Sequence, residues 1–310
     1  MSDPLLLDND RVSLADAGME TYLIYREGID LPQFASFTAL STTEGRSALR
    51  RYYEAIIDVA VRDRRTLLLD SATWRASSDW GAELGYSEAA LDEANAAAVA
   101  FASDLRAAAG PDADIVLGGC IGPRGDGYAA TSGMTPTQAA DYHAPQVRSL
   151  ARAGAQFIAG MTLGDANEAA GMMEAARENA IPAVASFTIE TDGRLASGQS
   201  VASIIAETDR LTDSYATFYL LNCAHPLHLE RALASSDPEL QRIRGIRTNA
   251  SMRSHAELDA ATDLDDGDPL DLARRCADLV TTYPRLAVVG GCCGTDARHI
   301  GAMSAALGAR

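Results

Sequence analysis

Residues 156–187 read QFIAGMTLGDANEAAGMMEAARENAIPAVASF, and this stretch contains the pattern that decides the fold. An apolar run at 156–160 is followed by a turn, an alanine-rich helical segment at 167–179 and a second apolar run at 183–187. Short apolar runs without alternation are typical of parallel strands that are buried on both faces. The stretch therefore predicts a strand–helix–strand unit of a parallel sheet.

The same pattern repeats along the 310 residues of the chain. Further strands are expected at 12–15, 66–69, 114–117, 217–221, 243–248 and 286–289, and further helices at 87–109, 138–153, 200–211, 269–281 and 296–307. Pro145 lies inside one of these helices and should kink or split it. Eight strands that alternate with helices predict an α/β fold, a single (β/α)8 TIM barrel forming one domain over 1–310. An open doubly wound sheet is the alternative, but no glycine-rich dinucleotide motif follows the first strand.

The amino-acid composition excludes several classes of protein. The net charge is −17 without any cluster of basic residues, which argues against nucleic-acid binding. The chain contains no lysine, which excludes enzymes that form a Schiff base through a lysine amine. No apolar run approaches the roughly 18 residues of a membrane span, and residues 1–9 lack a signal-peptide pattern. We therefore expect a cytoplasmic protein that binds neither nucleic acid nor membranes.

Three of the five cysteines come directly after predicted strands. Cys223 follows the sixth strand, and Cys292 and Cys293 follow the eighth within the sequence GGCCGT at 290–295. Because the carboxyl ends of barrel strands share one rim, all three sulfurs can reach one point. Three thiolates suit a zinc ion (Zn²⁺) whose fourth position stays open. The sequence therefore suggests a zinc site at the C-terminal rim of the strands.

Such a site predicts a particular chemistry. Zinc held by three thiolates binds an incoming thiol as a thiolate at neutral pH, and that thiolate can accept a methyl group from a sulfonium or ammonium donor. Cys120 and Cys276 are interpreted as buried small residues. His225 is either a fourth ligand or a residue at the start of a helix. If side chains of the protein fill all four coordination positions of the zinc ion, no substrate thiol can bind it, and the chain is a non-catalytic zinc or redox protein.

Three motifs of the chain are DAGMET at 16–21, NC at 222–223 and GGCCGT at 290–295, and a weaker one is ATWRAS at 72–77. Together they resemble the motifs of the homocysteine S-methyltransferase family. The resemblance spans essentially the whole chain. It implies zinc bound by Cys223, Cys292 and Cys293, with the sulfur of homocysteine as the fourth ligand.

The resemblance also implies substrate contacts. Asp16 would hold the amino group of homocysteine, and the backbone amides of Ala17, Gly18 and Met19 its carboxylate. Asn222 would orient the substrate or contact the metal region. The reaction would give methionine, with a small-molecule thiol and a methyl donor as the binding partners.

Two residues depart from the family pattern. Ala17 stands where the family has glycine, and Met161 stands where the family has a glutamate that binds the substrate amino group. A lost charge-assisted hydrogen bond costs about 1.5–3 kcal/mol of binding free energy. The acceptor is therefore either homocysteine held differently or another thiol that lacks the amino group.

The methyl donor is expected to be a small onium compound such as S-methylmethionine, S-adenosylmethionine or a betaine. Thr73 and Trp74 follow the second strand and are assigned to substrate binding, because an indole ring can hold an onium methyl group by cation–π attraction. Trp80 and Tyr86 are candidates to complete an aromatic cage. The polar segment 248–268 is either a solvated loop or a substrate lid. The sequence also allows a homo-oligomer.

Overall fold

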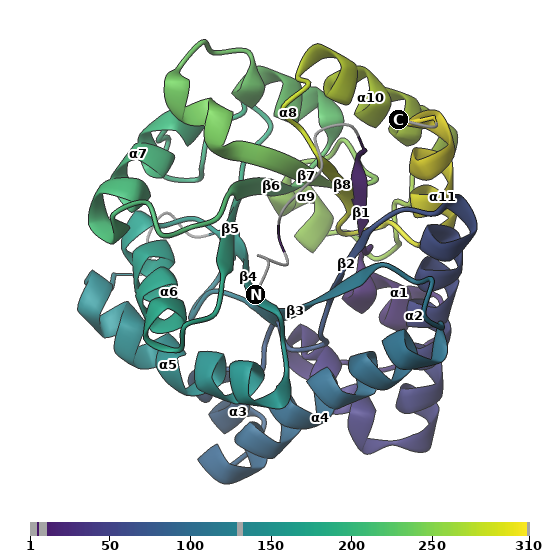
Figure 1. Cartoon of the computed structure of the whole chain (residues 1–310), viewed down its shortest axis with the longest axis vertical. Helices are drawn as coiled ribbons and strands as arrows, with labels where there is room; N and C mark the ends of the chain where they lie inside the picture. The colour runs from purple at the N-terminus through teal and green to yellow at the C-terminus, as the bar shows by residue number, and fades with distance from the viewer. Residues whose placement is uncertain (1–4, 6–10, 129–132, 309–310) are drawn as a thin grey trace.

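Eight parallel strands close into a barrel in the computed structural model, which describes residue 5, residues 11–128 and residues 133–308 (Figure 1). Each strand pairs with the next along the chain, and the last pairs with the first. The strands are β1 (Ser13–Ala15), β2 (Leu67–Asp70), β3 (Ile115–Ile121), β4 (Phe157–Leu163), β5 (Ala183–Thr188), β6 (Tyr219–Ala224), β7 (Ile243–Thr248) and β8 (Val288–Gly291). The predicted (β/α)8 fold is confirmed.

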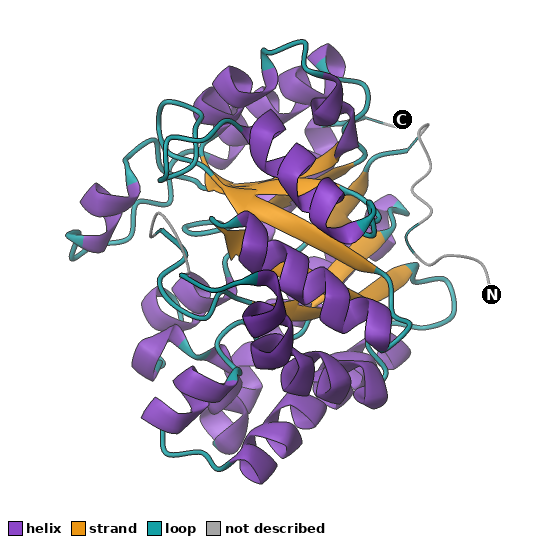
Figure 2. Ribbon diagram, turned by 90° about the vertical axis from the view of Figure 1, so that its left-hand side faces the viewer, coloured by secondary structure: helices purple, strands orange, loops and turns teal. Residues whose placement is uncertain are grey.

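Helices surround the strands on the outside of the barrel (Figure 2). The α-helices are α1 (Met19–Tyr25), α2 (Thr43–Asp63), α3 (Ser78–Glu83), α4 (Glu88–Ala108), α5 (Pro136–Ala153), α6 (Ala166–Glu178), α7 (Val201–Thr212), α8 (Pro226–Leu233), α9 (His255–Asp259), α10 (Pro269–Thr282) and α11 (Ala297–Ala306). Short 3₁₀ helices are η1 (Pro32–Phe34), η2 (Ser36–Ser41) and η3 (Pro238–Arg242). The helices expected from the sequence correspond to α4, α5, α6, α7, α10 and α11.

Pro145 does not split α5, which runs through it without a break. Residues on both sides of the proline are buried, including Ala139 before it and Val147 and Leu150 after it. Packing against the core on both sides therefore outweighs the hydrogen bond that proline cannot make.

The core has two layers. The larger one lies between the strands and the helices and includes Tyr52, Tyr53 and Ile56 of α2, all fully buried. The smaller one consists of alternate strand residues that fill the inside of the barrel, among them Leu68, Val116, Phe157, Val184, Leu220 and Val288. Because side chains fill the barrel, a small molecule finds room only at its rim.

Among the described residues, no helix is long and apolar enough to cross a membrane. The expectation that residues 1–9 carry no signal peptide falls on a segment of which only Leu5 is described. Leu5 is buried and packs with the residues that fill the barrel.

A hydroxyl group on α2 fixes the turn after β1. The Tyr52 Oη accepts from the Ala17 amide at 3.0 Å and donates to the Ala17 carbonyl at 2.7 Å. Tyr52→Phe leaves both buried backbone groups without this partner, so we expect the free energy of unfolding to fall by about 1–3 kcal/mol. Urea unfolding followed by circular dichroism measures the change. The control is Tyr25→Phe, whose side chain is exposed; an equal effect in both variants would contradict the argument.

Candidate active site

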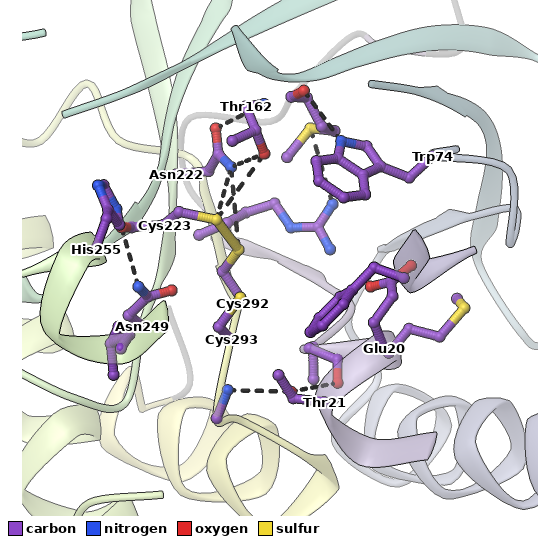
Figure 3. Close-up of a pocket in the computed structure, with 18 of the residues that line it drawn as sticks. Glu20, Thr21, Trp74, Thr162, Asn222, Cys223, Asn249, His255, Cys292 and Cys293 are labelled. Carbon is purple, nitrogen blue, oxygen red and sulfur yellow. Dashed lines mark hydrogen bonds between the residues drawn. A yellow bond between two sulfur atoms is a disulfide. The ribbon is translucent and has the colours of Figure 1, made fainter. Parts of the chain in front are cut away.

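A cavity of about 430 Å³ opens at the rim where the carboxyl ends of the strands meet (Figure 3). Segments that follow β1, β2, β3, β7 and β8 contribute to its wall, together with the carboxyl ends of β4 and β6. Its lining includes the predicted site residues Asp16, Met161, Asn222, Cys223, Cys292 and Cys293. The structure thus brings residues from opposite ends of the sequence into one cavity, as the barrel topology requires.

The three predicted metal ligands meet on one side of this cavity. The Sγ atoms of Cys223, Cys292 and Cys293 lie within 4.8 Å of one another. Cys223 and Cys292 form a disulfide in this structure, and Cys293 is a free thiol (Figure 3). Cys223 has a φ of 55°, which costs a residue with a side chain about 1–2 kcal/mol. The pairing of β6 is irregular between Asn222 and Ala224, and Asn222 and Cys223 therefore both line the cavity.

The side-chain amide of Asn222 is fixed with its NH₂ group toward the sulfurs. Its Oδ1 accepts from the Ser186 hydroxyl at 2.7 Å and from the Thr162 amide at 3.2 Å. Its Nδ2 lies 3.2 Å from the Cys223 Sγ and 4.0 Å from the Cys292 Sγ (Figure 3). This donor therefore points at the sulfurs of the candidate metal site.

The three sulfurs fit a zinc ion. Zinc–sulfur bonds of about 2.3 Å place thiolates around a tetrahedral ion roughly 3.8 Å apart, which is within the spread of these three sulfurs. The disulfide between Cys223 and Cys292 has to be reduced, and its two sulfurs have to separate, before they can hold the ion. Among the described residues, no fourth cysteine, histidine or carboxylate belongs to the group. His225 instead caps α8, because its Nδ1 accepts from the Leu227 amide at 3.4 Å. Cys120 and Cys276 are buried outside the group, as predicted.

Three charged side chains lie deep in the same cavity, and we call Asp16, Asp70 and Arg247 the charged cluster. Arg247 on β7 donates from Nη2 to Asp16 and from Nη1 to Asp70. All three side chains are buried, and burial raises the pKa of both carboxyl groups above their ordinary values. Burial opposes the charge of Arg247, but the two carboxylates outweigh it and raise the pKa of the guanidinium.

Sequence reasoning identified Asp16 but missed Asp70 and Arg247. A signal for Arg247 was present, because an arginine inside a strand that is buried on both faces requires a carboxylate partner. Which carboxylate takes that role depends on pairing between distant strands, and the sequence alone did not show it.

Met161 lies next to the charged cluster. Its Sδ is 4.0 Å from the Arg247 Nη1, and its carbonyl oxygen accepts from the Trp74 Nε1 at 3.3 Å. Met161 is buried and lines the cavity. This position therefore presents a thioether to a ligand where the family pattern has a carboxylate.

The backbone amides after β1 already have acceptors within the protein. The Ala17 amide donates to the Tyr52 hydroxyl, the Gly18 amide to the Thr295 carbonyl at 3.2 Å and the Met19 amide to the Ala17 carbonyl at 3.1 Å. A ligand carboxylate at this turn would share these donors. Gly18 is required here, because a Cβ would lie 2.3 Å from the Cys292 carbonyl oxygen.

The aromatic cage expected around Trp74 does not form. Trp74 lines the cavity, but the Arg75 guanidinium lies 4.1 Å from its ring centroid and 3.8 Å from that of Trp80. The cation that contacts the rings of Trp74 and Trp80 is thus the side chain of Arg75, and not a ligand. Tyr86 packs instead against Phe37, in a separate apolar cluster.

Thr73 lies outside the residues that line the cavity. It is fully buried, and its hydroxyl donates to the Cys120 carbonyl at 2.7 Å. Its carbonyl accepts from the Gln146 side chain at 2.8 Å. Its observed contacts therefore hold the segment after β2 in place.

The segment 248–268 covers the mouth of the cavity and contains the short helix α9. His255 Nε2 donates to the Cys223 carbonyl at 2.7 Å, and Asn249 Nδ2 donates to the same oxygen at 3.0 Å (Figure 3). The His255 ring also lies 4.0 Å from that of Tyr128, measured between centroids. The segment forms part of the cavity wall, and its two interpretations, a solvated loop or a substrate lid, stay predictions.

Comparisons with known proteins identify the family of the chain. The family model described as homocysteine S-methyltransferase matches residues 13–307. The homocysteine methyltransferase MmuM from Escherichia coli, in its oxidized form, is 21% identical, with a TM-score of 0.77 over 98% of this chain and 99% of that chain. Its metallated form is 20% identical, with a TM-score of 0.71 over 95% of this chain and 96% of that chain. A search of curated protein sequences finds no match. Because the family model covers nearly the whole chain, this methyltransferase belongs to the homocysteine S-methyltransferase family.

Proposed function

We propose that this methyltransferase is zinc-dependent and moves a methyl group from a small onium donor to the sulfur of homocysteine, giving methionine. The observation that carries the proposal is the group formed by Cys223, Cys292 and Cys293 on the wall of the cavity. The existence of a metallated form of E. coli MmuM supports it.

The cysteines would hold zinc, which when bound supplies a positive centre that lowers the pKa of the acceptor thiol. The acceptor thiol releases its proton to solvent, and its sulfur attacks the methyl carbon of the donor. The bond from that carbon to the positive sulfur or nitrogen of the donor breaks, and the electron pair stays on the donor atom, which becomes neutral. Because the leaving atom needs no proton, the protein need not supply a general acid for this step.

The mouth of the cavity suits a cationic donor. Glu20, Asp126 and Asp259 contribute carboxyl groups to its wall, and Tyr128 contributes an aromatic ring. Negative potential concentrates cations at such an opening, and ring faces attract onium methyl groups. S-methylmethionine, S-adenosylmethionine and betaine-like compounds all meet this description.

The inner part of the cavity would receive the acceptor. We assign Asp16 to the amino group of homocysteine and the turn at Ala17, Gly18 and Met19 to its carboxylate. Asn222 would keep the cysteine sulfurs in their thiolate form through its Nδ2.

A thiol without an amino group is the second candidate acceptor. The observation that favours it is Met161, which offers a thioether at the position where the family has a carboxylate. Homocysteine needs a carboxylate partner for its ammonium group at the charged cluster, and a thiol without an amino group does not.

The metal content of anaerobically purified protein and its methyl transfer activity test the proposed function together. We expect one zinc per chain and methionine formed from homocysteine with at least one donor from a panel of onium compounds. Elemental analysis and mass spectrometry of the product are the measurements. Zinc without transfer to homocysteine would favour the acceptor that lacks the amino group, and zinc without transfer to either thiol would favour a non-catalytic zinc protein. Fully reduced protein without zinc would refute the proposal.

A further inference from the structure

The charged cluster contains one more carboxylate than it has cations to pair with. Asp16 and Asp70 each contribute a potential negative charge, and both contact the same guanidinium, that of Arg247. With both carboxyl groups ionised, the cluster carries a net charge of −1. The exposed fractions of these three residues are 1%, 5% and 7%, so water does little to stabilise that charge.

Buried excess charge of this kind calls for either a proton or a cation. Arg247 cannot offset the second negative charge, because it carries only one positive charge. Its other N–H groups are also engaged: the Nε donates to the Gly291 carbonyl at 3.2 Å, and the Nη1 faces the Met161 sulfur. Burial raises the pKa of both carboxyl groups, as expected for a site whose negative charge is incompletely compensated. A ligand with one positive charge would complete the cluster.

The cluster also lies where the acceptor has to bind. Asp16 and Cys292 follow neighbouring strands, and the Gly291 amide donates to the Asp16 carbonyl at 2.8 Å. All three charged residues line the same cavity as the cysteines. A thiol whose sulfur reaches the cysteines therefore places its other end near the carboxylates.

We propose that Asp70 and Arg247 determine acceptor specificity, because together with Asp16 they form a buried site of net charge −1 that receives the ammonium group of an amino-acid thiol. This inference rests on the proposed function for the position of the acceptor sulfur. Asp70 supplies the carboxylate that Met161 lacks, and Arg247 holds both carboxylates in place while it cancels one of their charges. Of the two candidate acceptors, the cluster favours the one that carries an amino group.

The test compares homocysteine with 4-sulfanylbutanoate, which differs from it only by the missing amino group. Isothermal calorimetry on the reduced, zinc-loaded enzyme gives the ratio of their dissociation constants without any methyl donor. We expect the wild type to prefer homocysteine by about 10- to 100-fold. Asp70→Asn keeps the shape of the side chain but brings the cluster to zero charge, so the preference should fall to about threefold or less. Asp209→Asn removes a carboxylate from another Asp–Arg pair, that of Asp209 with Arg242, and should leave the ratio unchanged.

A double variant separates the charge of the cluster from the identity of its residues. Asp70→Asn combined with Arg247→Met leaves Asp16 as the only charged group of the cluster, with a net charge of −1 when it is ionised. The ammonium group of homocysteine favours that ionised form in place of Arg247, so the preference for homocysteine should return. Circular dichroism confirms that each variant is folded. Equal affinities for the two thiols in the wild type, or an unchanged preference in Asp70→Asn, would overturn the inference. Homocysteine preference without methyl transfer from any donor would support the inference and count against the proposed function instead.

Discussion

Cys292→Ala should lose bound zinc and reduce the rate of methyl transfer by at least about 1,000-fold. The Cys292 sulfur lies within 4.8 Å of those of Cys223 and Cys293, so it is one of the three proposed zinc ligands. Two thiolates bind zinc far more weakly than three, and the loss of a positive centre that activates the acceptor removes several kcal/mol of transition-state stabilisation. Zinc content by elemental analysis and kcat/KM with homocysteine measure the two effects.

Cys276→Ala is the matched control for this variant. Cys276 is also a buried cysteine, but it lies in α10 and outside the group of three. This variant should keep one zinc per chain and near wild-type kcat/KM, at a cost of about 1–2 kcal/mol in stability for the small cavity. If Cys292→Ala kept both zinc and activity, or if Cys276→Ala lost both, the assignment of the metal ligands would be wrong.

The fold could be predicted from the sequence because its strands are short, apolar and regularly spaced. The expected strand at 114–117 extends in the structure to Ile121, and the one at 156–160 extends to Leu163. Both extensions contain residues that read as turns, such as Gly118 and Gly119 in β3. Gly118 and Gly119 are strand residues because they pair with the neighbouring strand β4, and such pairing is decided by tertiary structure.

The site could be predicted only where its residues come in recognisable motifs. The three cysteines stand beside asparagine or glycine at strand ends, so topology alone brings them together. Asp70 and Arg247 are separated by 177 residues and form no motif. The Trp74 cage failed for a similar reason, because the residue that occupies its ring face is the adjacent Arg75, whose orientation depends on packing with Trp80.

Arg247→Met should lower the free energy of unfolding by about 3–5 kcal/mol at pH 7, because it leaves two buried carboxylates without their cation. Methionine keeps much of the volume of the arginine stem, so the effect reports on charge more than on packing. The control is Arg152→Met, which breaks the pair of Arg152 with Asp92. That pair is exposed, and its loss should cost no more than about 1 kcal/mol. Urea unfolding of both variants measures the difference.

The pH dependence of this loss follows from the direction of the pKa shifts. In Arg247→Met, burial still raises the folded-state pKa of Asp16 and Asp70, and the cation that opposed this shift is gone. The folded protein then binds protons that the unfolded chain, with an ordinary aspartate pKa of about 3.9, has released. The variant is therefore least stable above the raised pKa values, and its stability recovers relative to wild type as the pH falls toward about 4. A loss that stays constant between pH 5 and pH 8 would show that Arg247 stabilises the barrel by packing, and that the two carboxyl groups are not ionised in the folded enzyme.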